Sequence, residues 1–178
     1  MHILKHILFL PIAIGVTGLE AETVVVPAGG DIAEALALAA SGDIIQLEAG
    51  LYEPDETLLV DKMITLRGAV DEDGSPISII DGRSSIQVLS TTNVGSNTRI
   101  ENLVVRNGSA EIGGGLINFK SGPTLDNCMF MDNYAEFGGG VYNHGAGSVF
   151  RNCSFIGNTA EMEGGGVYEG YYGQSTFE

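Results

Sequence analysis

Short stretches of alternating apolar and polar residues recur along the second half of the chain. The clearest ones place two apolar side chains two positions apart, at Leu103 and Val105, at Cys128 and Phe130, and at Cys153 and Phe155. Because successive side chains of a strand point to opposite faces, this pattern predicts β-strands with one buried face. A second strand is predicted at the apolar residues after each glycine triplet, as in GGGVYN, and a third at PTL or SVF.

These strands belong to a repeat of 25 residues whose copies begin at Ile100, Leu125 and Phe150. The glycine triplets of the three copies align once a single inserted residue is allowed in the third copy. The other aligned sets are Asn102, Asn127 and Asn152; Val105, Phe130 and Phe155; and Ala110, Ala135 and Ala160. Self-similarity at a short fixed period indicates a solenoid, in which each repeat buries its apolar face against its neighbours.

The glycine triplets decide which kind of solenoid the repeat forms. Ankyrin and tetratricopeptide repeats need two helices per unit, and three adjacent glycines oppose a helix. Leucine-rich repeats have a suitable length, but their L-x-x-L-x-L spacing is missing here. The sequence therefore predicts an all-β fold, a right-handed parallel β-helix with about 25 residues per rung.

Residues one period apart are expected to stack at the strand spacing of about 4.8 Å. The set of Asn102, Asn127 and Asn152 is then predicted to form a ladder of hydrogen-bonded side-chain amides at a turn. Phe130 is predicted to stack on Phe155 inside the coil. Gly108, Asn133 and Asn158 align with one another, and we interpret them as turn residues because Gly and Asn tolerate a left-handed backbone.

The N-terminal part of the chain divides into three segments. Residues 1–21 carry Lys5, an apolar run over residues 7–19 and Ala21, the layout of a secretory signal peptide, which leaves residues 22–178 as the β-helix domain. No later segment is long and apolar enough to span a membrane. Residues 31–40 are predicted to form a capping helix that starts at Asp31 and buries Ile32, Leu36 and Ala39 or Ala40.

Residues 43–99 contain short apolar runs separated by turn residues, and we interpret them as irregular first rungs. Residues 100–178 are the regular repeats. The last repeat stops just before the next expected asparagine, so we expect the sequence to be truncated at its C-terminus and the protein to be a monomer or part of a longer chain.

The net charge of the chain is −15, with 23 acidic and 8 basic residues. This charge opposes binding to nucleic acids and to anionic lipids, since both require a basic surface. It is compatible with a soluble secreted protein and with divalent cations.

The repeats resemble those of chlamydial-type polymorphic outer membrane proteins. The resemblance rests on F-x-x-N, at 130–133 and 155–158, followed by GGGV at 138–141 and 164–167. The family usually has Gly-Gly-Ala at this point, and the first copy here has Val105 and Gly108 in place of Phe and Asn. The resemblance implies a surface protein of the outer membrane with a β-helical passenger and a role in adhesion.

Residues 31–68 resemble the capping helix and first rung of pectin methylesterases, pectate lyases and other secreted proteins of the pectate-lyase-like superfamily. The R-x-P-x-x-R pattern of the lyases and the Asp-bearing stretches of the esterases are missing here. Asp126, Arg151 and Asp132 come nearest to such a carboxylate-and-arginine site, and we interpret them as exposed turn charges that pair across rungs. Catalytic residues are therefore unknown, and we expect no cofactor-binding or metal-binding residues.

Histidine and cysteine chemistry is restricted by the few residues present. His144 is the one histidine beyond the signal peptide, and we interpret it as a surface turn residue. Cys128 and Cys153 occupy equivalent positions of adjacent rungs, where parallel side-chain directions oppose a disulfide bond. We expect buried, reduced thiols, while an oxidising compartment leaves a bond possible.

The sequence favours a non-catalytic scaffold or adhesin, secreted or at the cell surface, that contacts polysaccharide or another surface. Repetition of the same residues on each rung suits extended contact better than a single active site. The alternative is a polysaccharide lyase or esterase with its active site late in this sequence or beyond it, and Ca²⁺ would be expected as a cofactor under that alternative alone.

Overall fold

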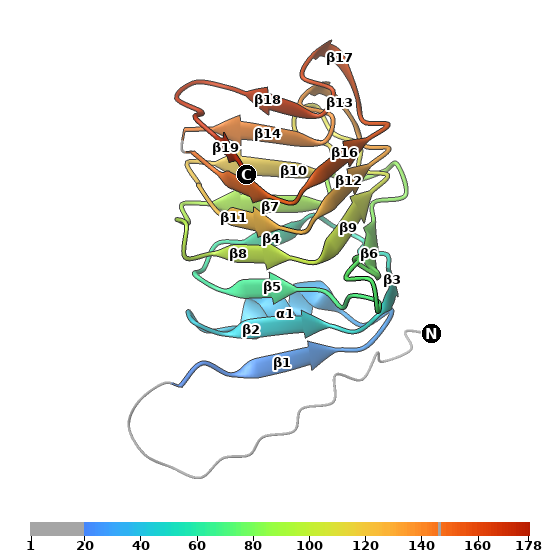
Figure 1. Ribbon diagram of the computed structural model, residues 1–178, viewed down its shortest axis with the longest axis vertical. Coiled ribbons are helices and arrows are strands. Elements are labelled where there is room, and N and C mark those ends of the chain that lie inside the picture. Colours follow the sequence, from blue (N-terminus) through green and yellow to red (C-terminus); the bar gives the residue numbers. More distant parts are fainter. Residues whose placement is uncertain (1–19, 146) are drawn as a thin grey trace.

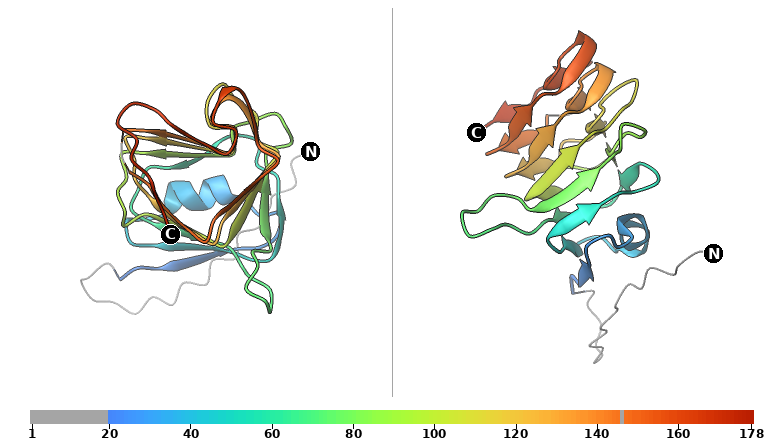
Figure 2. Two further views of the ribbon diagram at one scale, coloured as in Figure 1. Left: turned by 45° about the horizontal axis from the view of Figure 1, so that its top comes forward. Right: turned by 90° about the vertical axis from the view of Figure 1, so that its right-hand side faces the viewer.

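The chain forms a parallel β-helix of about six turns, as the computed structural model shows for residues 20–145 and 147–178 (Figure 1). Successive turns stack along one axis, so that strands far apart in the sequence lie side by side (Figure 2). The predicted fold class is confirmed. The predicted signal peptide, apart from Glu20 and Ala21, lies outside the described residues.

Three parallel sheets form the sides of the coil, and we name them sheets A, B and C. Sheet A contains β1 (Thr23–Val26), β2 (Ile44–Leu47), β5 (Thr65–Arg67), β8 (Arg99–Glu101), β11 (Thr124–Asp126), β15 (Val149–Arg151) and β19 (Thr176–Phe177). Sheet B contains β3 (Gly50–Tyr52), β6 (Ser78–Asp81), β9 (Leu103–Arg106), β12 (Met129–Met131) and β16 (Ser154–Ile156). Sheet C contains β4 (Leu58–Val60), β7 (Leu89–Thr92), β10 (Leu116–Phe119), β14 (Val141–His144) and β18 (Val167–Glu169).

A fourth, two-stranded sheet lies between sheets B and C in the last two turns. It pairs β13 (Tyr134–Phe137) with β17 (Thr159–Glu163) and has an irregularity after Ala135. The sequence pattern did not predict these strands. Their alternation of polar and apolar residues is short, and β17 carries the residue that makes the third repeat longer than the second.

The register of the sheets follows the sequence repeat. Phe130 is the partner of Val105 on one side and of Phe155 on the other. The rings of Phe130 and Phe155 are stacked, with centroids 5.4 Å apart and planes 8° from parallel, as predicted. Before the regular repeats the spacing varies, since Ile44, Thr65 and Arg99 are successive partners in sheet A.

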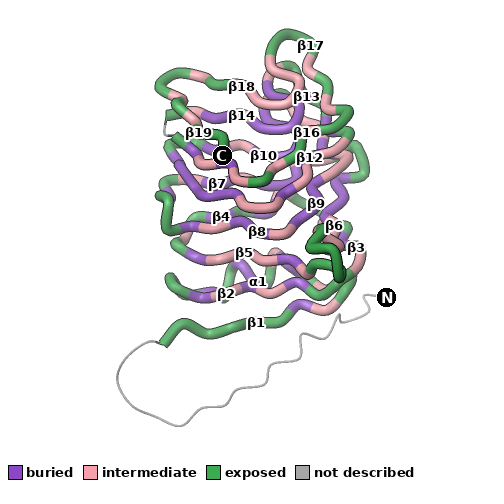
Figure 3. Tube along the Cα trace, viewed as in Figure 1, coloured by how far each residue is buried: buried purple, intermediate pink, exposed green. Residues whose placement is uncertain are grey.

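One cluster of buried apolar residues runs along the coil, and Figure 3 shows that buried positions recur from turn to turn. The inward row of sheet A is Ile45, Leu66, Ile100, Leu125 and Phe150, and it ends at Phe177, which stacks on Phe150 but is 58% exposed. The row of sheet B is Tyr52, Ile80, Val105, Phe130 and Phe155. Burial of such rows at about 25 cal/mol per Å² is the main favourable term in folding, and it depends on neighbouring turns covering one another.

The short helix α1 (Ile32–Leu38) lies near the N-terminal end of the coil, within the outline of the turns (Figure 2). It begins after Asp31, whose Oδ1 accepts a hydrogen bond from the backbone N–H of Glu34 at 2.9 Å. This is the N-cap predicted from the sequence. Ile32, Leu36 and Ala39 are buried, whereas Ala40 is exposed, so the apolar face of the helix ends at Ala39.

The first glycine of each triplet has a left-handed backbone, with φ of 60° at Gly113, 64° at Gly138 and 74° at Gly164. The third glycine has another role, because its Cα faces the next turn. A Cβ on Gly115 would lie 2.6 Å from the carbonyl oxygen of Gly140. The triplets therefore make a tight bend and then allow two turns to approach closely.

The interpretation of Asn133 and Asn158 as left-handed turn residues is wrong. The positive φ angles fall one residue earlier, at Asn107 (50°), Asp132 (51°) and Gly157 (64°). The chain bends at these residues because Asn, Asp and Gly tolerate the left-handed region. The following residue points its side chain into the coil at Asn133 and Asn158, whereas Gly108 occupies the equivalent position without a side chain.

Candidate functional site

Asparagine side chains form two ladders inside the coil. In the first, Asn133 Oδ1 accepts from the backbone N–H of Gly108 at 2.8 Å, and Asn133 Nδ2 donates to the carbonyl of Val105 at 3.0 Å and to Asn158 Oδ1 at 2.9 Å. Asn158 repeats the contact one turn later by donating to the carbonyl of Phe130. Each amide thus forms hydrogen bonds with the backbone of the preceding turn, and these bonds satisfy buried backbone groups.

The second ladder is the inward row of sheet C. Asn118 accepts from Thr91 Oγ1 at 2.6 Å and donates to Asn143 Oδ1 at 2.6 Å, and Asn143 donates to Glu169 Oε1 at 2.9 Å. Asn118 and Asn143 are fully buried. Their recurrence after 25 residues is visible in the sequence and marks them as a ladder, but sequence reasoning did not use it.

The ladder predicted at Asn102, Asn127 and Asn152 forms in part. All three residues have left-handed backbones at the turn between sheets A and B, with φ of 50° to 57°. Asn127 Nδ2 donates to Asn102 Oδ1 at 2.9 Å, whereas Asn152 Nδ2 lies 3.4 Å from Asp126 Oδ1 instead of bonding Asn127. A carboxylate is a stronger acceptor than an amide, which accounts for the change of partner.

Cys128 and Cys153 are both free thiols in the structure. Cys128 is 1% exposed and its thiol donates to the carbonyl of Ile100 at 3.3 Å, while Cys153 in the next turn is half-buried. Burial raises the pKa of Cys128 well above its ordinary value. The neighbouring Cys128 thiol lowers the pKa of Cys153. These thiols behave as core residues with unequal access to solvent.

Alkylation should therefore distinguish the two cysteines. We expect iodoacetamide at pH 8 to modify Cys153 in the native protein well before Cys128, because the thiolate is the reactive form and Cys128 is both buried and protonated. Peptide mass spectrometry over a time course measures both rates, with urea-unfolded protein as the control in which they become similar. Equal rates in the native protein would contradict this description, and so would a disulfide-linked peptide.

The outward face of sheet A carries a row of charged residues in which two acidic residues lie between two arginines. Arg67, Glu101, Asp126 and Arg151 are successive partners along the sheet. Glu101 accepts hydrogen bonds from Arg67 Nε at 2.7 Å and from Arg99, and Arg151 Nε lies 2.6 Å from Glu178 Oε2. Asp132 follows β12, at the bend after sheet B, and does not join Asp126 and Arg151 on sheet A. The three residues singled out in the sequence therefore form no common site, and the row is a set of ion pairs across rungs.

Glu101 should make the stability of the coil depend on acidic pH. Burial raises the pKa of Glu101, but hydrogen bonds from Arg67 and Arg99 and their charges outweigh burial and hold the pKa below its ordinary value. The resulting stabilisation is present above the ordinary glutamate pKa of about 4.3 and is lost as the pH falls through the lower native value. We expect urea midpoints of the native chain to fall more steeply than those of Glu101→Gln between about pH 5 and pH 3. Parallel pH profiles would contradict this assignment.

The outward face of sheet C is aromatic toward its C-terminal end. We call this cluster the aromatic strip; its members are Phe119, Tyr142, His144, Tyr168 and Tyr171. Phe119 and His144 are partners in the sheet and their rings are stacked, with centroids 5.2 Å apart and planes 3° from parallel. Tyr142 and Tyr168 stack in the neighbouring row, with ring centroids 5.3 Å apart.

His144 is the last residue of β14, so the interpretation of His144 as a turn residue is wrong.

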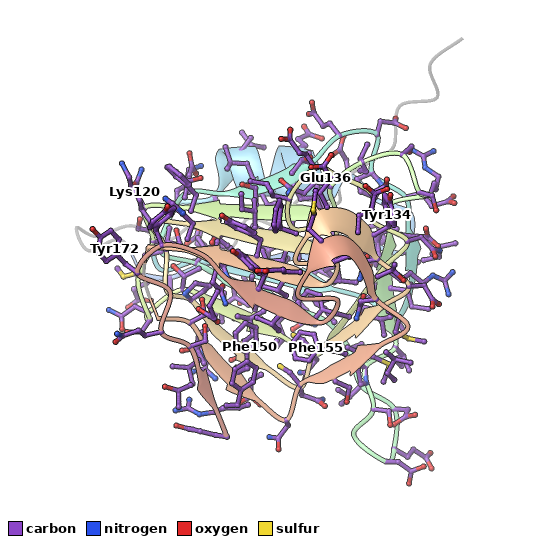
Figure 4. All side chains as sticks on the ribbon, turned by 90° about the horizontal axis from the view of Figure 1, so that it is seen from above. Lys120, Tyr134, Glu136, Phe150, Phe155 and Tyr172 are labelled. Carbon is purple, nitrogen blue, oxygen red and sulfur yellow. The ribbon has the colours of Figure 1, made fainter. Side chains whose placement is uncertain are left out.

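The turn after β18 extends the aromatic strip. Tyr171 packs its edge against His144, with centroids 6.5 Å apart, and is 79% exposed. Lys120 lies at the other margin of the strip, with Nζ 5.3 Å from the centre of the Phe119 ring. Seen from above, Lys120 and Tyr172 lie at one corner of the coil, and Tyr134 and Glu136 lie at another (Figure 4).

Two features are missing from residues 20–145 and 147–178, the part of the chain that the structure describes. No group of three or more His, Cys, Asp or Glu residues in these ranges is arranged to hold a metal ion. Within the same part of the chain, no helix has both the length and the apolar character needed to cross a membrane.

Comparison with protein-family models, with curated proteins and with solved structures gave no match to this chain. The fold and its outer faces define the class of the protein, a parallel β-helix repeat protein. The structure supports the β-helix fold that both resemblances imply, and no family match supports the assignment to pectate lyases or to polymorphic outer membrane proteins.

Proposed function

We propose that this chain is a secreted or cell-surface repeat protein that acts as a non-catalytic scaffold or adhesin and contacts polysaccharide or another surface. The observation that carries the proposal is the repetition of outward side chains from turn to turn. The aromatic strip on sheet C presents similar groups on successive rungs, and the row on sheet A presents charged groups that pair from one rung to the next. Such rows provide many equivalent contacts, which add by multivalency.

The sequence features that support a surface role are the layout of residues 1–21 and the resemblance of the repeats to those of polymorphic outer membrane proteins. The net charge of −15 supports solubility outside the cell and opposes nucleic acid as a partner. We propose accordingly that the protein is exported.

Turnover of a polysaccharide tests the non-catalytic part of the proposal. The chain is incubated with polygalacturonate and Ca²⁺, and the appearance of unsaturated product is followed by absorbance, with a pectate lyase as positive control. We expect no product above the protein-free blank. Steady formation of product that scales with protein concentration would overturn the scaffold proposal and favour the lyase alternative.

An adhesion assay tests the other part of the proposal, that the chain contacts a surface. We expect the chain to be retained on surfaces coated with cell-wall material or host matrix, and retention to rise steeply with the density of coating because contacts are multivalent. Retention equal to that of an albumin control on each coating would contradict the proposal.

A further inference from the structure

We infer that the aromatic strip is a binding surface for uncharged polysaccharide, with the sugar rings packed on the exposed parts of the aromatic rings. The inference rests on the proposed function and gives it a location and a class of ligand. Its first basis is the geometry of the strip. Four ring-bearing residues from three successive turns lie on one outward face, although outward positions of a strand are ordinarily polar, and Tyr171 adds a fifth ring from the loop after β18.

The rings of the strip are arranged in overlapping pairs. The centroids of the two pairs are 5.2 Å and 5.3 Å apart, with planes 3° and 25° from parallel, in the range of stacked aromatic pairs. Phe119 is 39% exposed and Tyr171 is 79% exposed. The strip therefore offers ring surface at intervals of about one strand spacing, in line with the coil axis.

Backbone strain beside the strip supports a role for exposed rings. Tyr172 has a φ of 63° and its side chain is 86% exposed. A bulky residue in the left-handed region costs on the order of 1 kcal/mol or more, and glycine would relieve this strain. Packing does not account for a tyrosine here, since the side chain is almost wholly in solvent. The exposed ring of Tyr172 is therefore available to a ligand of the strip, although other non-glycine residues of the coil, such as Lys120, also have a positive φ.

Charge selects an uncharged polysaccharide as the ligand. The faces of aromatic rings are electronegative and attract the C–H groups of a sugar ring, which carry small positive charges. Glu163 raises the pKa of Tyr168 by its charge, after the larger effect of burial, so a carboxylate lies close to the strip. The chain as a whole carries a charge of −15. This charge opposes polyuronates and other polyanions although Lys120 lies at the margin of the strip, whereas hydroxyl groups can donate to its carboxylate and phenol oxygens.

The strip would stay exposed in a longer chain with further turns beyond Glu178. A further turn would stack on the open edges of β16, β18 and β19, along the axis of the coil. The outward face of sheet C would remain on the side of the coil. An apolar patch at the open end, by contrast, could be covered by such a turn and supports no inference about ligands.

A panel of immobilised polysaccharides tests the inference. The probes are cellulose, chitin, xylan, mannan and β-1,3-glucan as uncharged chains, with polygalacturonate as the anionic chain. The variants are Phe119→Ala and Tyr171→Ala in the strip, and Tyr134→Ala as a matched control, because Tyr134 is an exposed tyrosine at another corner (Figure 4). We expect retention on at least one uncharged chain and about tenfold weaker binding by each strip variant. The Tyr134→Ala variant should bind like the native chain.

The variant Tyr172→Gly distinguishes an effect on binding from an effect on stability. Glycine suits a φ of 63°, so this variant should have an unchanged or higher urea midpoint and yet bind more weakly. Binding to no uncharged chain, or to polygalacturonate alone, overturns the inference while leaving adhesion to other surfaces intact. Native-like binding by the strip variants overturns the location. Sedimentation showing a dimer that the strip variants abolish, without polysaccharide binding, assigns the strip to self-association and also overturns the inference.

Discussion

Gly115→Ala is expected to lower the free energy of unfolding by about 3 kcal/mol. The added Cβ would lie 2.6 Å from the carbonyl oxygen of Gly140 and 3.0 Å from both Asn133 Nδ2 and Phe130 Cδ1. None of these neighbours can move freely, because Gly140 belongs to the next turn and Asn133 and Phe130 are buried. Two turns would have to separate at this point. Urea unfolding followed by far-ultraviolet circular dichroism measures the loss.

Gly166→Ala is the matched control for this prediction. Gly166 is also the third glycine of its triplet, but the nearest atom to an added Cβ is Phe155 Cβ at 3.4 Å, an ordinary contact. We expect its free energy of unfolding to stay within about 0.5 kcal/mol of the native value. Equal losses in the two variants would show that glycine is needed at this position for local conformation and not for the approach of two turns.

The repeat predicted the fold because a period of 25 residues sets the register of the sheets. Once the period is known, Val105, Phe130 and Phe155 must be neighbours, and their alternation with polar residues turns them inward. The N-cap at Asp31 and the helix after it were predicted for a similar reason, since a capping side chain and a stripe of apolar residues are local features.

The turns were harder to predict, because asparagine serves two different purposes in this coil. Asn102 and Asn127 lie at left-handed turns, while Asn133 and Asn143 are buried hydrogen-bonding groups. Both kinds of asparagine recur with the same period, so the period alone does not distinguish a turn residue from a buried hydrogen-bonding residue. A useful signal was present one residue earlier, where Asn107, Asp132 and Gly157 are all residues that tolerate a left-handed backbone.

The aromatic strip was missed because sequence reasoning did not assign the faces of the strands in sheet C. Asn118 and Asn143 point inward, and their neighbours Phe119, Tyr142 and His144 consequently point outward. A polar residue is ordinarily expected outside and an aromatic residue inside, so the pattern of this sheet is reversed at these positions. The buried amides are tolerated because each has partners in the adjacent turns.

Asn133→Ala is expected to destabilise the coil by about 3 kcal/mol, because the change leaves buried polar groups without partners. Asn133 is 1% exposed and bonds both the N–H of Gly108 and the carbonyl of Val105. Each orphaned group costs about 1–3 kcal/mol when water cannot reach it. Asn158→Ala is the matched control, since the equivalent side chain in the last turn is half-buried and water can replace its partners. We expect a loss of about 1 kcal/mol for this variant, and equal losses would contradict the role of burial.

Asn133→Asp distinguishes the hydrogen bonds from the shape of the side chain. The introduced carboxyl keeps the acceptor for Gly108 but, when ionised, has no proton to donate to Val105 or Asn158. In its buried site the carboxyl should have a raised pKa, because burial disfavours the charged form. Stability relative to the native chain should therefore fall as the pH rises above the ordinary aspartate pKa of about 3.9. A difference in urea midpoint that is constant between pH 4 and pH 7 would show that the site requires only the volume of the amide, and the ladder would then have no energetic role.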